Sequence, residues 1–303
     1  IKEVLAPMVL NKVWGSPSEL NQWFRPIRGH QMARAALENA CWDMMARTNN
    51  VPLHQLLRGT RKKIPCGVSI GIQDSPEQLL EKIKTEIDSG YRRIKIKIKP
   101  GWDYDIVSRV RKQFPDIPLS VDANSAYTLE DIDLLKRFDD FNLVMMEQPL
   151  SYDDIVDHSR LQSQIQTPIC LDEPITSVDN ARKAIEMKSG RIINLKLGRV
   201  GGFSEALKIH DYAYEHNIPV WCGGMLEAGI GRSHNIAMST LPGFSLPGDV
   251  SASKRYFRED IIDPPVTVDD NGFIHVPQIN GTGYEPKEEY IEKITVRKEV
   301  FQH

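Results

Sequence analysis

The chain has 303 residues, of which 41% are hydrophobic and 26% are charged, and its formal net charge at pH 7 is −3. This balance argues against a nucleic-acid-binding protein, because acidic residues outnumber basic ones and no Lys/Arg run is interleaved with aromatic residues. No apolar run approaches the ~20 residues that a membrane span requires. We therefore expect a globular protein with one large and one small domain, and with neither a nucleic-acid nor a membrane partner.

The cysteine pattern and the first residues give two further expectations. The four cysteines lie far apart and form no CxxC pair: Cys41, Cys66, Cys170 and Cys222. We expect them to be reduced core residues of a cytoplasmic protein. The chain opens without Met and without a signal-peptide pattern, so we expect it to be part of a longer protein.

The first part of the chain differs from the rest. Residues 1–28 are mixed in character and carry three prolines, whereas apolar residues at three- and four-residue intervals predict a helix over 29–48. A short helical stretch follows over 52–58. We assign residues 1–63 to a small, mainly helical domain.

Strands and helices then alternate. Apolar runs predict eight strands, at 64–70, 93–99, 119–122, 144–147, 169–172, 192–196, 219–222 and 244–246. Capping residues and apolar periodicity predict the helices between them, at 75–90, at 103–113, from Thr128, from about Ser177, at 205–215 and at 231–241. Residues from 251 to 303 lose this pattern, and we expect them to form an extension that packs on the N-terminal domain.

Charged residues recur at one phase of this alternation. Lys97, Asp122, Glu147, Asp172 and Lys196 each end an apolar strand, at intervals of 25, 25, 25 and 24 residues. Such a period fits one βα unit, and eight units close a barrel whose active site lies at the C-terminal ends of the strands. An open doubly wound sheet is the alternative, but its ligand crevice lies at one switch point rather than at successive strand ends. We therefore predict an α/β fold with a barrel over residues 64–250.

The three acids predict a metal site. Asp122, Glu147 and Asp172 would bring carboxylate oxygens from adjacent strand ends to one point, without His or Cys, and oxygen-only ligation suits Mg²⁺, with Mn²⁺ as the alternative ion. A single acid at such a position commonly caps a neighbouring helix. Three acids in register with two lysine positions are poorly explained in that way.

The lysines predict proton transfer. Lys95 and Lys97 are two residues apart on one strand, so both should face the barrel interior, where a buried ammonium group needs acids or a function to balance it. Lys196 would approach from the far side of the ring. A lysine on each side of a bound substrate suggests proton transfer at either face of a carbon acid. Lys99 precedes Pro100, where the strand leaves the barrel, and is expected to be solvated.

These residues resemble the pattern of the enolase superfamily, in its muconate-lactonising subgroup: Lys-x-Lys on the second strand, acids ending the next three, and Lys ending the sixth. More narrowly, residues 122–128, 221–227, 229–232 and 246–249 are similar to the o-succinylbenzoate synthase and N-succinylamino acid racemase family. The resemblance implies a modified (β/α)8 barrel of the (β/α)7β type with part of an α+β capping domain. It also implies a homo-oligomer.

The resemblance further implies residue roles. Lys97 would remove a proton α to the substrate carboxylate, Mg²⁺ would stabilise the resulting enediolate, and Lys196 would stabilise it or act on the opposite face. Arg199 matches a position associated with racemase ability. The remaining positions that we assign to substrate binding or to support of the site are Asn124, Gly224, Met225 and Glu227.

Several activities fit these roles. We predict o-succinylbenzoate formation by dehydration, a step of menaquinone biosynthesis, with N-succinylamino acid racemisation as a second or principal activity. Dipeptide epimerases carry an Asp-x-Asp after the last strand, whereas this chain has Asp249 alone, and residues 219–222 lack the histidine of the mandelate-type subgroup. His210 and His234 are expected to be structural or exposed. The alternative from another class is a non-catalytic barrel that binds a carboxylate ligand.

Overall fold

The computed structural model describes residues 1–10 and 12–300. Its centre is a parallel sheet of seven strands whose spatial order follows the sequence. The strands are β2 (Val68–Ile70), β3 (Ile94–Lys97), β4 (Leu119–Asp122), β5 (Met145–Glu147), β6 (Ile169–Leu171), β7 (Ile192–Leu195) and β8 (Val220–Cys222). Most of their residues are buried, as expected for parallel strands covered on both faces.

The register of the sheet explains why charged side chains gather at one end. Lys97 lies opposite Asp122, and Asp122 lies opposite Glu147 in the next pair. Because all strands run in the same direction, the apolar part of each strand fills the barrel and the terminal residues meet at one rim.

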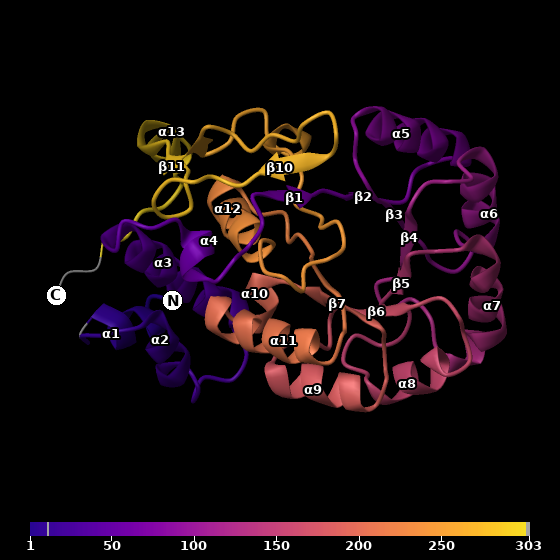
Figure 1. The fold of residues 1–303 in the computed structure, drawn as a ribbon, viewed down its shortest axis with the longest axis horizontal. Coiled ribbons are helices and arrows are strands. Elements are labelled where there is room, and N and C mark those ends of the chain that lie inside the picture. The colour runs from indigo at the N-terminus through magenta and orange to yellow at the C-terminus, as the bar shows by residue number, and fades with distance from the viewer. Residues whose placement is uncertain (11, 301–303) are drawn as a thin grey trace.

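Helices cover the outside of the curved sheet (Figure 1). In chain order the helices of residues 64–250 are α5 (Pro76–Asp88), α6 (Tyr104–Gln113), α7 (Ile132–Arg137), α8 (Val156–Gln162), α9 (Val178–Glu186), α10 (Leu197–Val200), α11 (Phe203–Glu215) and α12 (Gly229–Met238). Ser75 and Ser177 accept hydrogen bonds from the first turns of α5 and α9, so polar caps fix where these helices begin. The helix expected from Thr128 begins instead with a 3₁₀ turn (Leu129–Asp131) before α7, and a second 3₁₀ turn (Phe138–Phe141) follows α7.

The single strand expected over 64–70 is wrong. The chain forms β1 (Lys63–Pro65), which pairs antiparallel with β10 (Phe273–His275), and then β2, which begins the barrel. Gly67 lies between them, and a Cβ there would come within 2.8 Å of the Arg93 guanidinium. The chain therefore changes neighbours at a glycine, where the backbone must pass close to a buried side chain.

The strand expected over 244–246 is also wrong, although its position in the barrel is filled. The chain from 243 to 249 is irregular and makes isolated bridges to both neighbours. On one side Val220 and Asp249 donate to the carbonyls of Gly243 and Cys222, at 3.1 and 2.8 Å. On the other side Gly67 donates to the Gly248 carbonyl at 2.7 Å. The barrel is thus closed by an irregular segment, and the predicted α/β barrel is confirmed.

The N-terminal helices and the C-terminal segment lie together beside the barrel (Figure 1). Residues 1–28, which are mixed in sequence character, contain two short helices in their described part. The helices are α1 (Leu5–Leu10), α2 (Pro17–Trp23), α3 (Gln31–Thr48) and α4 (Leu53–Leu56), and the C-terminal elements are a 3₁₀ turn (Ser253–Arg255), β9 (Ile262–Asp263), β10, β11 (Glu285–Pro286) and α13 (Glu288–Ile294). Arg47 of α3 pairs with Glu285 at 2.8 Å. The boundaries at 63 and 250 stay a prediction.

In the described part of the chain, no helix is both long and apolar enough to cross a membrane.

Candidate active site

Lys95 and Lys97 both reach Asp122 at the rim of the barrel. Their Nζ atoms lie 3.2 and 2.6 Å from Asp122 Oδ2, which confirms that the two side chains share one face of β3. The Lys97 side chain is 30% exposed and that of Lys95 4%, so Lys97 is the lysine that a substrate can reach. Burial raises the pKa of Asp122, but the two lysines outweigh it and hold that pKa below its usual range.

Glu147 is fully buried. Its two carboxylate oxygens accept from Lys95 Nζ at 2.6 Å and from Asn194 Nδ2 at 2.7 Å. Burial, together with the nearby charges of Asp122 and Asp172, raises the pKa of Glu147 to about 8. Burial is the largest cause, and Lys95 and Lys196 offset part of the effect of the two aspartates.

Asp172 follows β6 and lies on the Lys196 side. Its carboxylate pairs with Lys196 Nζ at 2.6 Å and also with Arg199, which α10 carries three residues further on. In the eight positions of the barrel, β3 and β7 are four apart. The two lysine-bearing strands therefore lie on opposite sides of the ring, as the sequence predicted.

The expected convergence of the three acids on one point is not seen. Within residues 1–10 and 12–300, no three His, Cys, Asp or Glu side chains come close enough to hold one metal ion. Each carboxylate is turned toward a lysine, because an ammonium group is the nearest charge that can balance it. The donor set nevertheless fits Mg²⁺ or Mn²⁺, since the ligands are carboxylate oxygens from neighbouring strand ends. The metal-ligand roles stay predictions.

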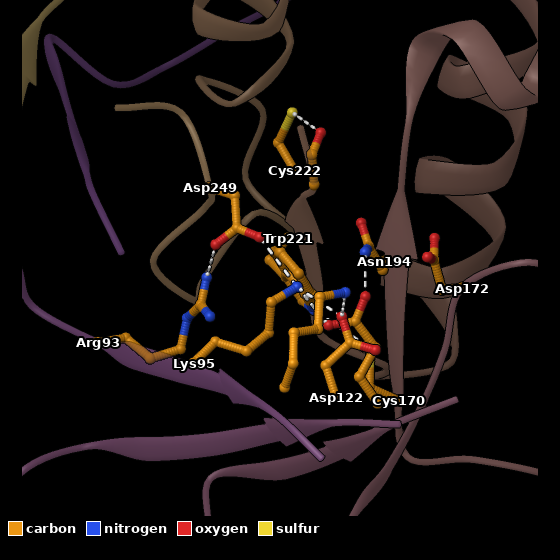
Figure 2. Close-up of polar contacts among 12 residues, drawn as sticks. Arg93, Lys95, Asp122, Cys170, Asp172, Asn194, Trp221, Cys222 and Asp249 are labelled. Carbon is orange, nitrogen blue, oxygen red and sulfur yellow. Dashed lines mark hydrogen bonds and ion pairs between the residues drawn. The ribbon is translucent and has the colours of Figure 1, made fainter. Parts of the chain in front are cut away.

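A buried ionic group below the rim was missed by the sequence reasoning (Figure 2). Asp249 lies between Arg93 and Lys95, at 2.6 and 2.9 Å, and both cations lie 4.7 Å from the Trp221 ring centroid. Burial opposes the charge of Asp249, but the two cations outweigh it and hold its pKa far below the usual range. Burial also lowers the pKa of Lys95, yet Asp249, Glu147 and Asp122 together raise it well above its ordinary value. Lys95 is therefore held as a cation, which favours an electrostatic rather than a proton-transfer role.

Asn124 and Glu173 extend the Lys97 side. Asn124 Oδ1 accepts from Lys97 Nζ, and Asn124 Nδ2 donates to Glu173 Oε1 at 3.2 Å. The sequence pointed to Asn124, whereas Glu173 was missed because it follows the more prominent Asp172. Its signal is a second acid directly after a strand-ending acid.

Another missed acid supports the Lys196 side from α3. Glu38 is fully buried and accepts from the backbone N–H groups of Phe203 and Ser204, at 2.7 and 2.9 Å, and from Trp42 Nε1 at 2.9 Å. These bonds satisfy the free N–H groups at the N-terminus of α11. A Cβ at Gly202 would overlap the Glu38 carboxylate, so a glycine is required there. Glu38 thus joins the N-terminal helices to the segment that follows Lys196.

The loop after β8 borders the Lys196 side. A Cβ at Gly223 would overlap Lys196 and Asn194, so this glycine gives the lysine room. Glu227 was expected to bind substrate or support the site. Its carboxylate accepts hydrogen bonds from the Met225 N–H at 2.8 Å and from Asn235 Nδ2 at 3.0 Å, and these bonds stabilise the loop that contains it. A Cβ built on Gly224 would lie 3.5 Å from the carbonyl oxygen of Asp249.

Two cavities bear on where a ligand fits. One of about 400 Å³ lies between α3, α10, α12 and this loop, and Met225 and Glu227 are among its lining residues. Another of about 620 Å³ lies at the opposite end of the barrel, where β3 and β4 begin. The second is far from the lysines and acids, and the chemistry of the rim places the site at the first end.

The remaining predictions concern which side chains are buried and which are exposed. Lys99 is exposed, as expected. His210 is buried and accepts from the Gly243 N–H at 2.9 Å, and His234 is buried against Phe203, so both are structural. The four cysteines are buried free thiols.

Comparisons with known proteins agree with this architecture. Residues 78–290 match the family described as enolase C-terminal domain-like, and residues 1–58 match the N-terminal domain of mandelate racemase / muconate lactonizing enzyme. A solved structure of an enolase-superfamily member from Listeria innocua superposes with a TM-score of 0.93 at 46% identity, over 97% of this chain and 79% of that one.

Named relatives are similar along the whole chain. An o-succinylbenzoate synthase of Geobacillus kaustophilus is 54% identical over 99% of this chain and 80% of the relative, and one of Bacillus subtilis is 48% identical over 100% and 81%. An N-succinylamino acid racemase of Thermus thermophilus is 47% identical over 98% of this chain and 80% of the relative. The chain therefore belongs to the enolase superfamily, in the family of enzymes that includes these synthases and racemases.

Proposed function

We propose that this enzyme removes the proton α to a carboxylate of a small substrate and forms o-succinylbenzoate by dehydration. The observation that carries the proposal is the placement of Lys97 and Lys196 on opposite sides of the barrel rim, each paired with one of the three acids. This arrangement offers an acid or base to either face of one carbon. The relatives named as synthases support the choice of reaction.

In this reaction the lysines and the acids have different roles. Lys97 takes the α-proton as an amine, and the ammonium group so formed returns the proton to the departing hydroxide, which leaves as water. Lys196 stays protonated opposite and stabilises the negative charge on the substrate. Mg²⁺, held by Asp122, Glu147 and Asp172, would supply further positive charge for the substrate carboxylate. Lys95 stays a cation and balances Glu147.

A dedicated N-succinylamino acid racemase is the second candidate. Arg199 and Lys196 both form ion pairs with Asp172. Lys196 therefore has a second cation beside it, at the face of the substrate to which it would deliver a proton. In that reaction Lys196 gives its proton to the face opposite Lys97. The relative named as a racemase supports this candidate.

We propose a homo-oligomer in the cytoplasm that acts on a small carboxylate and has no nucleic-acid or membrane partner. The buried free thiols support a reducing compartment.

The test compares two substrates with Mg²⁺ present. The hydroxy-acid precursor of o-succinylbenzoate reports dehydration, and each enantiomer of an N-succinyl amino acid in D₂O reports α-proton exchange. A synthase has a higher kcat/KM for the precursor than for the N-succinyl amino acid. A dedicated racemase has a higher kcat/KM for the N-succinyl amino acid. Absence of turnover and of exchange with both substrates would overturn the proposal and leave carboxylate binding alone.

A further inference from the structure

Glu173 is a half-buried acid at the site for which the proposed reaction has no use. It follows Asp172 directly, and its Oε2 is buried without a hydrogen-bond partner among the residues that the structure describes. A second carboxylate beside Asp172 costs free energy, because burial and a neighbouring like charge both oppose its ionised form. Its other oxygen, Oε1, accepts from Asn124 Nδ2 at 3.2 Å.

The bond from Asn124 selects one of two amide orientations. Lys97 Nζ donates to Asn124 Oδ1, while Asn124 Nδ2 donates to Glu173. An ammonium group can only donate, and a carboxylate oxygen accepts, so both neighbours require the same orientation. Rotation of the amide would turn its NH₂ group toward the ammonium of Lys97. Glu173 therefore favours the orientation in which Lys97 meets an acceptor.

The backbone of Asn124 is already fixed by other contacts. Asn124 and Ser125 have φ values of 41° and 66°, a left-handed conformation that costs free energy in residues with a side chain. The Asn124 N–H donates to Asp122 Oδ1 at 3.0 Å, and the Ser125 N–H donates to the Gln148 carbonyl at 2.8 Å. With the main chain held from β4 and β5, the direction of the amide depends on Lys97 and Glu173.

We propose that Glu173 is a positioning residue that acts through Asn124 and holds Lys97 between two acceptors, Asp122 Oδ2 and Asn124 Oδ1. The inference rests on the proposed function, in which Lys97 moves the α-proton from one face of the substrate. Lys196 depends on Asp172 and on the packing of α10. Loss of the Glu173 acceptor therefore weakens catalysis at the Lys97 face and spares the Lys196 face.

The first experiment measures α-proton exchange of each enantiomer of an N-succinyl amino acid in D₂O, with Mg²⁺ present. The enantiomer that stops exchanging in Lys97→Ala defines the Lys97 face. Glu173→Ala slows exchange at that face by about tenfold or more, the scale of one lost hydrogen bond to a charged group, and leaves the other face within about threefold. Glu173→Gln stays within about threefold at both faces, because its amide oxygen still accepts. The exposed Glu186→Ala on α9 is the control and changes neither face.

A double-variant cycle tests whether Glu173 acts through Asn124. Glu173→Ala combined with Asn124→Ala exchanges no more slowly than Asn124→Ala alone, because the route is already broken. Additive losses would overturn the inference, and so would equal losses at both faces. A Glu173→Gln variant as slow as Glu173→Ala would assign the effect to charge and would also overturn it.

A spectroscopic measurement separates this inference from the proposed function. The side-chain amide resonances of Asn124 in a ¹H–¹⁵N spectrum shift in Glu173→Ala and keep their position in Glu173→Gln. Resonances that do not move in Glu173→Ala overturn the inference whatever the activity. A wild-type enzyme that exchanges neither enantiomer and does not dehydrate the precursor contradicts the proposed function instead.

Discussion

The two lysine-bearing sides of the rim are built in different ways. Lys97 ends β3, and its partners come from the next strand and from the turn after it. Lys196 precedes α10, which packs extensively on α3 from the first 50 residues of the chain. The Lys97 side chain is 30% exposed and that of Lys196 12%. Strand register therefore positions one side, and packing between distant segments positions the other.

The sharpest way to test the comparison is to remove each lysine separately. Lys97→Ala and Lys196→Ala should each lower exchange at one face by about 10² to 10⁴, the usual contribution of a positioned acid or base, and leave the other face measurable. Stereospecific exchange in D₂O gives both rates in one assay. Loss of exchange at both faces in each variant would mean that the two sides of the rim do not act separately.

Removal of Asp249 tests what supports the Lys97 side from below. Asp249→Asn leaves Arg93 and Lys95 buried without their shared anion, so the free energy of unfolding should fall by about 3 to 5 kcal/mol. Urea unfolding measures the loss. Asp179→Asn removes an exposed acid that pairs with two cations on α9, and its unfolding should stay near that of the wild type. A small effect of Asp249→Asn would show that the interior ions are dispensable.

A pH titration tests the packing behind the Lys196 side. Burial lowers the pKa of His234 to about 4 in the folded protein, against about 6.5 when unfolded. The unfolded chain therefore binds more protons between these values, so stability is full above pH 6.5 and falls as the pH drops toward 4. At about 1.4 kcal/mol per pKa unit the loss reaches about 3.5 kcal/mol at most. Urea unfolding at several pH values measures it, and His234→Gln should flatten the slope, whereas the exposed His275→Gln should not.

The smallest expected effect comes from Glu38. Glu38→Gln replaces one of two acceptor oxygens with an NH₂ group and leaves an N–H at the start of α11 unsatisfied, so stability should fall by about 1 to 2 kcal/mol. Exchange at the Lys196 face should slow more than at the Lys97 face. Equal slowing would show that α3 stabilises the barrel without favouring either side.

Much of the fold and the rim could be predicted because both depend on local pattern. Parallel strands are apolar throughout, and the polar residue that ends each one recurs with the βα unit, so Lys97, Asp122, Glu147, Asp172 and Lys196 were found from spacing. The break between β1 and β2 was missed because apolar residues recur at every second position through it, at Ile64, Cys66, Val68 and Ile70. Its one signal was Gly67, a glycine inside a strand pattern.

The missed residues act across long sequence separations. Asp249 lies in an irregular segment, and its partners are 156 and 154 residues away. Glu38 sits within a helix, where an acid usually faces solvent, and its partners are 165 and 166 residues away. Neither role leaves a periodic signal, because each depends on how segments meet in three dimensions.

Trp221, fully buried with the Arg93 guanidinium and the Lys95 ammonium each 4.7 Å from its ring centroid, gives the enzyme an intrinsic optical reporter. Indole emission responds to the electric field across the ring, so its wavelength depends on the charges of these two side chains. A variant that retains only this one of the five tryptophans would report ligand binding at the rim as a shift in emission wavelength, without an added label.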